Sequence, residues 1–276
     1  MGKWPILDEI EMLDGRIDEK TYEHELEKLQ HRLLDLQVNH LRTGGRVVIG
    51  IDGWDAAGKG GLIERIVAGL EPKSTQVWRI GPPTREEQGR HYLWRFWNRL
   101  PAPGNWAIFD RTWYGRVLVE RIEGLCSVEA WKRAYREINE FERQLADDGA
   151  HVVKLLVHVS AEEQKRRMID RLNKSHKHYK IGLEDFRNIA KRKEYLEAYH
   201  DMLERTDTDY APWHVIASDI KEHARLEGLR IIDKQVGKGM EIPEQPLDVK
   251  IIEAAFKLWD WTPGKKHNNK NHNKKS

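Results

Sequence analysis

Residues 53–60, with the sequence GWDAAGKG, have the residue types and spacing of a phosphate-binding loop. A β-branched run precedes them and the helical pattern LIERIVAGL follows, as such a loop requires. Glycines let backbone N–H groups turn toward phosphate oxygens, the helix N-terminus adds partial positive charge, and Lys59 is expected to contact the transferring phosphoryl group. The residues expected to bind phosphate through the loop are Gly53, Ala56, Ala57, Gly58, Gly60 and Gly61. The alternative interpretation is a glycine-rich turn with an incidental lysine.

One position departs from the usual form of this loop. Gly60 stands where Ser or Thr would place a hydroxyl on Mg²⁺. Asp55 is the candidate replacement, because a hard divalent cation prefers carboxylate oxygen, and a carboxylate facing phosphates without a metal would add like-charge repulsion. The sequence therefore predicts an obligatory Mg²⁺, with Mn²⁺ as the alternative ion. The competing interpretation of Asp55 is a turn residue that hydrogen-bonds its own backbone.

A second acidic group follows the apolar strand pattern WAIFD, which ends in Asp110. Such an acid at a strand end holds Mg²⁺ near the loop in nucleotide hydrolases and kinases. Arg111 and Arg116 come directly after it, and their planar guanidinium groups fit phosphate oxygens in pairs. We therefore expect Asp110 to bind metal and both arginines to contact phosphates, whereas Arg121 is expected to pair with a neighbouring glutamate on an exposed turn.

Hydrophobic periodicity indicates the elements that must position these groups. The predicted strands are residues 46–52, 76–80, 106–110, 151–160 and 213–218. The predicted helices include 17–42, 62–70, 85–100 and 127–149. A capping box of Thr84 and Glu87 supports the third helix, while Ser127 and Gly149 bound the fourth.

Strands that alternate with helices predict a parallel sheet covered on both faces, so the expected fold class is α/β. We expect an N-terminal helical extension over 1–43, a core over 44–236 and a C-terminal extension over 237–276. The end of the chain, GKKHNNKNHNKKS, offers no apolar residue to bury and is expected to be disordered.

The segment 161–211, which we call the lid, is helical in pattern and rich in basic residues. It is too long for a simple crossover between strands. A nucleoside triphosphate has three phosphates to neutralise, so a long basic tract favours a longer polyanion, such as a phosphate polymer. The alternative is that these charges form solvated helix faces.

Composition narrows the class of protein. The 276 residues are 33% charged, with a net charge of +2, which argues against binding DNA or RNA through overall charge. Cys126 is the single cysteine, so an intramolecular disulfide is impossible. The N-terminus lacks the apolar run of a signal peptide, and no stretch has the ~18 apolar residues of a membrane span. We therefore expect a soluble cytoplasmic protein with no membrane partner.

Four ordered motifs, GWDAAGKGG, PPTREEQGRHYLWRFWNRLP, FDRTWYGRVLVERIEG and ERTDTDYAPWHVI, together resemble the polyphosphate kinase 2 family, especially its polyphosphate:AMP phosphotransferases. The resemblance covers about residues 20–235. It implies a thymidylate-kinase-like P-loop fold and Mg²⁺ dependence. It also implies reversible phosphoryl transfer from inorganic polyphosphate to a nucleoside mono- or diphosphate, and we rank AMP to ADP first.

The family's site residues transfer onto matching positions of this chain. Its loop aspartate and lysine fall on Asp55 and Lys59, and its second acid and adjoining arginine fall on Asp110 and Arg111. The resemblance makes these four catalytic, with the two aspartates as metal ligands. The lid residues chosen for polyphosphate are Arg167, Arg171, Lys174, Lys177 and Lys180.

Two positions differ from the family pattern. Thr112 replaces the usual Ser but keeps the hydroxyl. In the lid, KHYK at 177–180 replaces a motif like KRWK, so an aromatic face is kept, but the cation expected at His178 is lost near neutral pH. This change could weaken donor binding.

Three alternatives remain open from the sequence. An ATP-dependent nucleoside monophosphate kinase would share the loop, the Asp-Arg pair and a basic lid, but would normally keep Ser or Thr at position 60. A non-catalytic polyphosphate- or nucleotide-binding protein would keep the fold alone. The N-terminal helix and the apolar run Ile251–Trp261 indicate a homo-oligomer, or else packing within one chain.

Overall fold

The computed structural model describes residues 4–10, 12, 15–242 and 247–264. The chain divides into two compact units, residues 1–240 and 241–276. The first unit holds the sheet and the helices around it. The second contains one helix, α10 (Val249–Trp259), none of whose side chains is buried. The tail predicted to be disordered lies, from residue 265 onward, outside the described residues.

A five-stranded parallel sheet forms the centre of the first unit, in the order β2-β3-β1-β4-β5. Its strands are β1 (Arg46–Gly53), β2 (Thr75–Arg79), β3 (Trp106–Asp110), β4 (Ala150–His158) and β5 (Trp213–Ala217). All five predicted strands are present, displaced by two residues at most. Inner strands covered on both faces are nearly continuous apolar runs, as the buried residues of β1, β3 and β4 show. The α/β class is confirmed.

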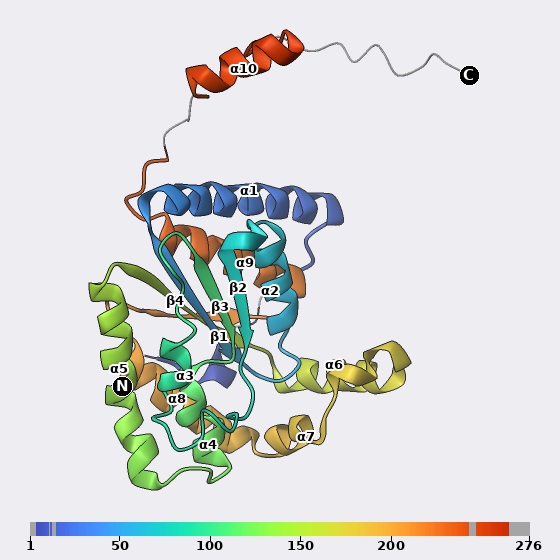
Figure 1. Ribbon diagram of the computed structural model, residues 1–276. Helices are drawn as coiled ribbons and strands as arrows, with labels where there is room; N and C mark the ends of the chain where they lie inside the picture. Colours follow the sequence, from blue (N-terminus) through green and yellow to red (C-terminus); the bar gives the residue numbers. More distant parts are fainter. Residues whose placement is uncertain (1–3, 11, 13–14, 243–246, 265–276) are drawn as a thin grey trace. The chain divides into compact units, whose positions relative to one another are not determined.

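Helices cover both faces of this sheet (Figure 1). The α-helices of the first unit are α1 (Glu19–Thr43), α2 (Lys59–Ala68), α3 (Trp94–Trp97), α4 (Val119–Ile122), α5 (Val128–Asp147), α6 (Ala161–Asn173), α7 (Leu183–Ala190), α8 (Arg192–Thr206) and α9 (Lys221–Val236). The short 3₁₀ helices are η1 (Leu7–Glu9), η2 (Pro72–Ser74), η3 (Trp113–Arg116) and η4 (Ser175–Lys180). One face carries α2 and α9, with α1 packed on both, and α5 with α8 covers the other.

Capping residues bound α1 at both ends and α5 at its start. The Asp18 side chain accepts a hydrogen bond from the Thr21 amide at 3.0 Å, and Gly44 ends α1 with a φ of 78°. At α5, Ser127 Oγ accepts from the Ala130 amide at 3.2 Å. These caps satisfy end groups that a helix cannot satisfy itself. Among the described residues, no helix combines the length and apolar character needed to cross a membrane.

The prediction of a helix over 85–100 is wrong, because only α3 and a series of turns form there. Its capping box does exist, since Glu87 Oε2 accepts from the Thr84 amide at 2.9 Å. Gly89 then adopts a φ of 77°, which ends the helical path. Glu87 is buried and pairs with Arg95 at 3.1 Å and Arg99 at 2.7 Å, so the segment folds around this carboxylate.

The register of the sheet brings two predicted site segments to one edge. Ile51 of β1 lies beside Asp110 of β3, and Gly53 lies beside Val157 of β4. The loop after β1 and the Asp-Arg pair after β3 therefore leave the sheet side by side. Ligands of open α/β sheets bind at this carboxyl edge.

Candidate functional site

The loop between β1 and α2 has a backbone that depends on its glycines. Gly53 has a φ of 139°, and a Cβ there would lie 2.1 Å from the Val157 carbonyl oxygen. Gly58 has a φ of 112° and caps α2. Residues with a side chain rarely adopt these backbone conformations. The spacing of the two glycines in the sequence therefore determines the shape of the loop. At Gly60, by contrast, a Cβ would meet no atom within 4 Å, so a serine or threonine would fit there.

Lys59 lies folded over this loop. Its Nζ donates to the carbonyl oxygens of Gly53 at 2.7 Å and Trp54 at 2.8 Å. Burial lowers the pKa of Lys59, and the carboxylates of Asp55 and Asp110 oppose that shift. The ammonium is thus held in a poorly solvated position among the predicted acids, where its attraction for a phosphate would be stronger than in water.

Asp55 is tied to the lid and to Arg111 rather than to its own turn. Its side chain is 13% exposed. Oδ2 accepts from Asn188 Nδ2 at 2.7 Å, and Oδ1 lies 3.7 Å from Arg111 Nη2. Within the described residues this carboxylate makes no hydrogen bond to the loop backbone, and the Asp55 carbonyl oxygen accepts from Gln164 Nε2 at 2.9 Å. These contacts disfavour the interpretation of Asp55 as a simple turn residue.

Asp52 is a third carboxylate of the site, and sequence analysis missed it. It is 5% exposed and accepts a hydrogen bond from the Thr112 hydroxyl. Burial raises the pKa of Asp52 to about 6, with Thr112 and Lys59 opposing the shift and Asp110 adding to it. Asp52 directly precedes the loop, and that position was the sequence signal that could have identified it. The hydroxyl that it binds belongs to Thr112, which stands where the family usually has serine.

The donor set suits a cation that arrives with phosphates. Across the described residues, no group of three or more His, Cys, Asp and Glu side chains could hold a metal by itself. Asp55 lies in the loop and Asp110 ends β3 beside Ile51, so two carboxylates stand at the same edge of the sheet. Mg²⁺ binds in this way, through one or two carboxylates completed by water and substrate phosphates.

Arg111 remains accessible beside the loop. Its φ of 66° is unusual for a residue with a side chain, and its amide donates to the Ile51 carbonyl oxygen at 3.0 Å. The side chain is 45% exposed and lies 3.5 Å from Glu184 of α7. Burial alone would lower the pKa of Arg111, but Asp55 and Glu184 outweigh it and raise that pKa. The guanidinium thus stays charged between the loop and the lid.

The other two arginines of this segment differ from each other. Arg116 pairs with Glu120 at 2.8 Å and lies over the Tyr92 ring at 4.5 Å. Arg121 pairs with Asp201 of α8 at 2.7 Å, so it supports the fold, though not through the neighbouring glutamate that we expected.

A pocket of about 640 Å³ opens beside the loop. The turns after β2 and the start of α4 form its walls, and Arg111, Arg116 and Arg187 line it. Arg111 also lines a cavity of about 70 Å³ against Asp52 and Asp55, so the pocket adjoins the loop acids. Its size fits a nucleotide, and its lining offers arginines for phosphates among several glutamates and apolar side chains.

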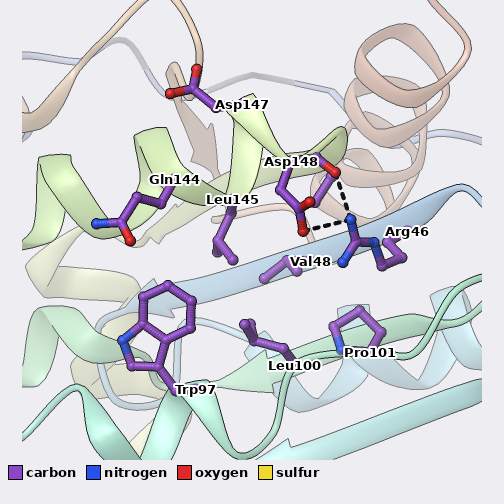
Figure 2. A pocket seen from close by; sticks show the side chains of 10 residues that line it. Arg46, Val48, Trp97, Leu100, Pro101, Gln144, Leu145, Asp147 and Asp148 are labelled. Atoms are coloured by element: carbon purple, nitrogen blue, oxygen red, sulfur yellow. Dashed lines mark hydrogen bonds and ion pairs between the residues drawn. The ribbon is translucent and has the colours of Figure 1, made fainter.

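A second pocket, of about 480 Å³, lies at the opposite edge of the sheet (Figure 2). Arg46 and Ala150, which begin β1 and β4, line it together with Trp97 and Leu145. Arg46 is already paired with Asp148 at 2.7 Å. None of the predicted site residues reaches this pocket.

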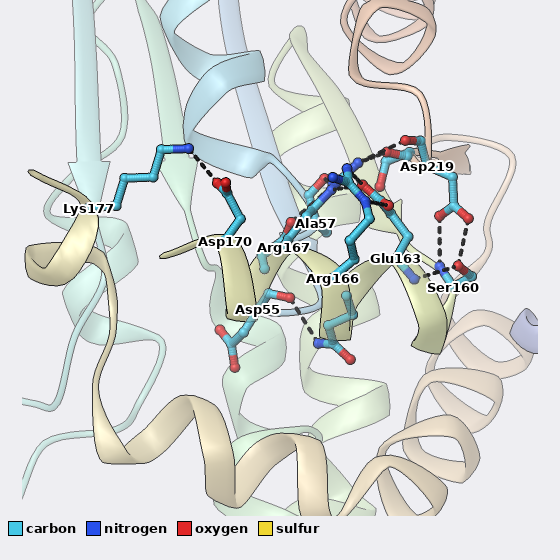
Figure 3. A network of polar contacts seen from close by, with 12 residues as sticks. Asp55, Ala57, Ser160, Glu163, Arg166, Arg167, Asp170, Lys177 and Asp219 are labelled. Carbon is cyan, nitrogen blue, oxygen red and sulfur yellow. Dashed lines mark hydrogen bonds and ion pairs between the residues drawn. The ribbon is translucent and has the colours of Figure 1, made fainter. Parts of the chain in front are cut away.

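Arg167 corrects one lid assignment. It is 5% exposed and was expected to face polyphosphate. Its Nη1 instead donates to the carbonyl oxygens of Ala56 at 3.0 Å and Ala57 at 2.8 Å, while Nη2 donates to those of Ser218 and Asp219. Figure 3 shows the guanidinium between the loop and Asp219. Arg167 therefore clamps the loop from beneath, because a buried guanidinium must satisfy its donors within the protein.

The remaining four predicted lid cations gather at the end of α6 and in η4. Lys174 and Lys177 share Asp170, at 2.7 Å and 2.5 Å, and their hydrogen bonds lower the pKa of that carboxyl. Arg171 donates to the Lys180 carbonyl oxygen at 3.0 Å. Lys180 is exposed and lies near the Tyr179 ring. These cations form a continuous basic segment on the lid.

Comparison with known proteins places this arrangement in a family. The sequence profile described as Polyphosphate kinase 2 (PPK2) matches residues 16–243. The chain belongs to the polyphosphate kinase 2 family. Within it, a polyphosphate:AMP phosphotransferase of Pseudomonas syringae pv. tomato is 43% identical over 234 residues, covering 84% of this chain and 47% of that protein. The ADP-polyphosphate phosphotransferase of Pseudomonas aeruginosa is 36% identical, covering 84% of this chain and 76% of that protein.

The fold of the family is also shared. The crystal structure of polyphosphate kinase 2 from Arthrobacter aurescens has a TM-score of 0.83 and 30% identity, covering 94% of each chain. The P-loop kinase-like fold expected from the sequence is therefore confirmed. The present chain spans about half the length of the curated polyphosphate:AMP phosphotransferases that it matches, at 45–47%.

Proposed function

We propose that this chain is a polyphosphate-dependent nucleotide phosphotransferase that transfers a phosphoryl group from inorganic polyphosphate to AMP, giving ADP, in a reversible reaction. The observation that carries the proposal is the convergence of Lys59, Asp55 and Asp110 at one sheet edge, between a nucleotide-sized pocket and a basic lid. Donor and acceptor would thus meet at the loop. The names of the relatives support the choice of substrates.

The chemistry asks for positioning and charge stabilisation rather than a covalent nucleophile. The loop amides and Lys59 hold the transferring phosphoryl group, and Arg111 holds an oxygen of the donor or acceptor phosphate. Asp55 and Asp110 would hold Mg²⁺, which neutralises charge on the phosphates when it is bound. Closure of the lid over the loop would exclude water, so that transfer to the nucleotide outcompetes hydrolysis.

The acceptor is assigned to the 640 Å³ pocket, because Arg111 and Arg116 line it and Arg111 also lines the small cavity against the loop acids. AMP ranks first on the relatives named polyphosphate:AMP phosphotransferase. Nucleoside diphosphates rank second, since relatives that are named for ADP and GDP share the same region. Both acceptors would present a terminal phosphate to the same guanidinium groups.

The donor is assigned to the basic segment at the end of α6 and in η4. Lys174 and Lys177 share one carboxylate, Asp170, so two cations are balanced by a single charge. A polyanion can contact this segment without breaking a buried ion pair, because the side chains of both lysines and of Asp170 are at least 31% exposed. Its length favours a phosphate chain over three phosphates.

The test is ³¹P NMR of the purified protein with AMP, long-chain polyphosphate and Mg²⁺, beside Lys59→Ala and a sample without metal. ADP formed only in the complete wild-type sample supports donor, acceptor and metal together. No ADP, with ATP or GTP then formed from ADP or GDP, would shift the acceptor to diphosphates.

The two competing functions have distinct outcomes in the same assay. Turnover with ATP but not with polyphosphate would establish an ATP-dependent monophosphate kinase. Gly60 disfavours it, because the metal-binding hydroxyl is missing although the loop has room for it. Calorimetric binding of AMP and polyphosphate without ADP at any Mg²⁺ concentration would establish a non-catalytic binding protein.

We also propose that the chain forms a homo-oligomer and works in the cytoplasm. Five large apolar side chains of α10 are exposed within its own unit: Val249, Ile251, Phe256, Leu258 and Trp259. Faces of this kind commonly mark contact sites. Light scattering after size exclusion at micromolar protein tests the oligomer, and a monomeric mass would refute it.

A further inference from the structure

Helix α7 of the lid is held in place by polar contacts. None of its side chains is buried, although it lines both cavities beside the loop through Glu184 and Asn188. Hydrophobic burial supplies most of the energy that docks a helix, so a helix without buried side chains is weakly seated. The few polar contacts that α7 makes with the loop side of the site therefore determine its position.

Two such contacts connect α7 to predicted site residues. Asn188 Nδ2 donates to Asp55 Oδ2 at 2.7 Å, and Glu184 Oε1 lies 3.5 Å from Arg111 Nη1. The second pair is about half exposed on both sides and is therefore weakly stabilising. The first joins a part-buried amide to a carboxylate that is 13% exposed, so its geometry is better defined.

The orientation of the Asn188 amide is fixed from its other side. Tyr195 of α8 donates its hydroxyl to Asn188 Oδ1 at 3.1 Å. Burial raises the pKa of Tyr195, so its hydroxyl keeps the proton that it donates to Asn188. With its oxygen engaged, the amide must present its NH₂ group to Asp55.

We propose that Asn188 is a positioning residue that orients the Asp55 carboxylate only when α7 is seated over the loop. This inference rests on the proposed function for the role of Asp55 as a cation ligand. Seating of α7 thereby completes the site, and an open lid leaves the Asp55 carboxylate free to rotate. Premature hydrolysis of the donor is reduced, because the site is complete only when it is covered.

A neutral amide suits this task better than a charged side chain. A lysine at position 188 would hold Asp55 but cancel the charge that a divalent cation needs. An amide leaves the formal charge on the carboxylate and occupies one lone-pair direction of Oδ2. The other oxygen, Oδ1, accepts no hydrogen bond from the described residues, and Arg111 Nη2 lies 3.7 Å from it. Partners of ligating carboxylates elsewhere commonly act in this way.

The experiment compares Asn188→Ala and Tyr195→Phe with Asn173→Ala. Asn173 is a matched control because it is an exposed lid asparagine at the end of α6. Two readouts are used, and neither requires polyphosphate turnover. Hydrogen exchange with ADP and Mn²⁺ present measures protection of the α7 amides. Electron paramagnetic resonance measures the affinity of the Mn²⁺–ADP complex.

Asn188→Ala should abolish most protection of α7 and weaken Mn²⁺–ADP binding by about 10-fold, within the range seen for lost partners of metal ligands. Tyr195→Phe should give a smaller change of the same sign, and the control none. Unchanged exchange and unchanged Mn²⁺ affinity in correctly folded Asn188→Ala, checked by thermal melting, would overturn the proposal. If polyphosphate proved not to be the donor, the expected changes in hydrogen exchange and in Mn²⁺–ADP affinity would be the same. The role of Asn188 and the proposed function are therefore tested separately.

Discussion

The phosphate loop and helix α7 face each other across the site but are held in opposite ways. The loop is fixed by backbone geometry at Gly53, by the buried clamp of Arg167 and by burial of Trp54, which is 4% exposed and donates to His158 Nδ1 at 2.8 Å. Helix α7 buries no side chain and reaches the loop through Asn188. The molecule therefore keeps its phosphate-binding geometry in the core and its closure in a weakly held element.

This difference explains how one site can hold the transferring phosphoryl group in a fixed geometry and still admit a long phosphate polymer. Groups that contact the transferring phosphoryl group must keep their geometry to within a fraction of an ångström. A cover that admits a long anion must instead open and close, so it is drawn from the low-stability end of the fold. Substitutions on the two sides should accordingly affect different measurements.

The largest effect is expected from Lys59→Ala. Loss of its ammonium at the phosphoryl group should lower kcat/KM for ADP formation by about 10³-fold, at the upper end of the loss for one stabilising donor. The free energy of unfolding should change by about 1 kcal/mol or less, because two hydrogen bonds to loop carbonyls are replaced by water. Coupled assay and urea denaturation measure the two quantities.

Lys73→Ala is the control, since Lys73 is an exposed lysine of η2. A Lys59→Ala enzyme that keeps a tenth of wild-type activity would show that the loop does not supply the chemistry. A large loss of stability would show that Lys59 serves the fold instead.

Next in size is the effect of breaking the clamp beneath the loop. Arg167→Met leaves four buried or partly buried carbonyl oxygens without this donor and removes one of the two arginines that pair with Glu163, so the free energy of unfolding should fall by about 3 kcal/mol or more. Arg166→Met removes a neighbouring arginine that is 68% exposed and should stay within about 0.5 kcal/mol of wild type. Equal effects of the two in urea denaturation would mean that Arg167 is an ordinary lid cation.

Arg167 also shows which parts of the site could be predicted from the sequence and which could not. The loop, Asp110 and Arg111 were predictable because each depends on local spacing and on strand ends that a parallel sheet brings together. Arg167 was not, since Arg166, Arg167 and Arg171 look alike in sequence and only helix packing decides which one turns inward. Asn188 and Asp52 were missed for a related reason, because their hydrogen bonds cross between elements far apart in the chain.

The predicted helix over 85–100 does not form because of two residues, Gly89 and Glu87. Its capping box formed, yet Gly89 took a left-handed conformation and Glu87 was pulled inward by Arg95 and Arg99. Local signals were correct there, and a buried ion-pair cluster outweighed them. The wall of the acceptor pocket therefore could not be derived before the fold was known.

A pH-dependent difference should follow from Asp52. Its folded pKa of about 6 lies above its usual 3.8, so the folded state binds this proton more tightly and the resulting stabilisation, complete below about pH 4, is lost as pH rises to 6. Asp52→Asn keeps an oxygen that can accept from Thr112 and does not titrate. The stability of the variant relative to wild type should therefore increase between pH 4.5 and 7.5, by up to about 3 kcal/mol.

Urea denaturation of both proteins across this range checks the sign, with Asp35→Asn as a control at a carboxyl on α1 away from the loop. A constant difference between wild type and Asp52→Asn would show that Asp52 stays ionised in the fold. It would then add a permanent negative charge to the phosphate-binding side of the site.

The smallest effect should separate two lysines of the lid. Lys174 shares the Asp170 carboxylate with Lys177, whereas Lys180 has no ion-pair partner within the described part of the chain and lies near the Tyr179 ring. Each replacement by alanine removes one positive charge, but Asp170 keeps Lys177 as a partner after loss of Lys174.

If polyphosphate is the donor, Lys180→Ala should raise the KM for polyphosphate about 3- to 5-fold at low salt, because an exposed charge contact contributes at most about 1 kcal/mol. Lys174→Ala should raise this KM less than about 2-fold under the same conditions. The gap should close at 0.5 M salt, where exposed charges are screened beyond about 5 Å. Equal KM values at low salt would mean that the chain of phosphates does not follow η4, and the donor would then have to enter along another side of the loop.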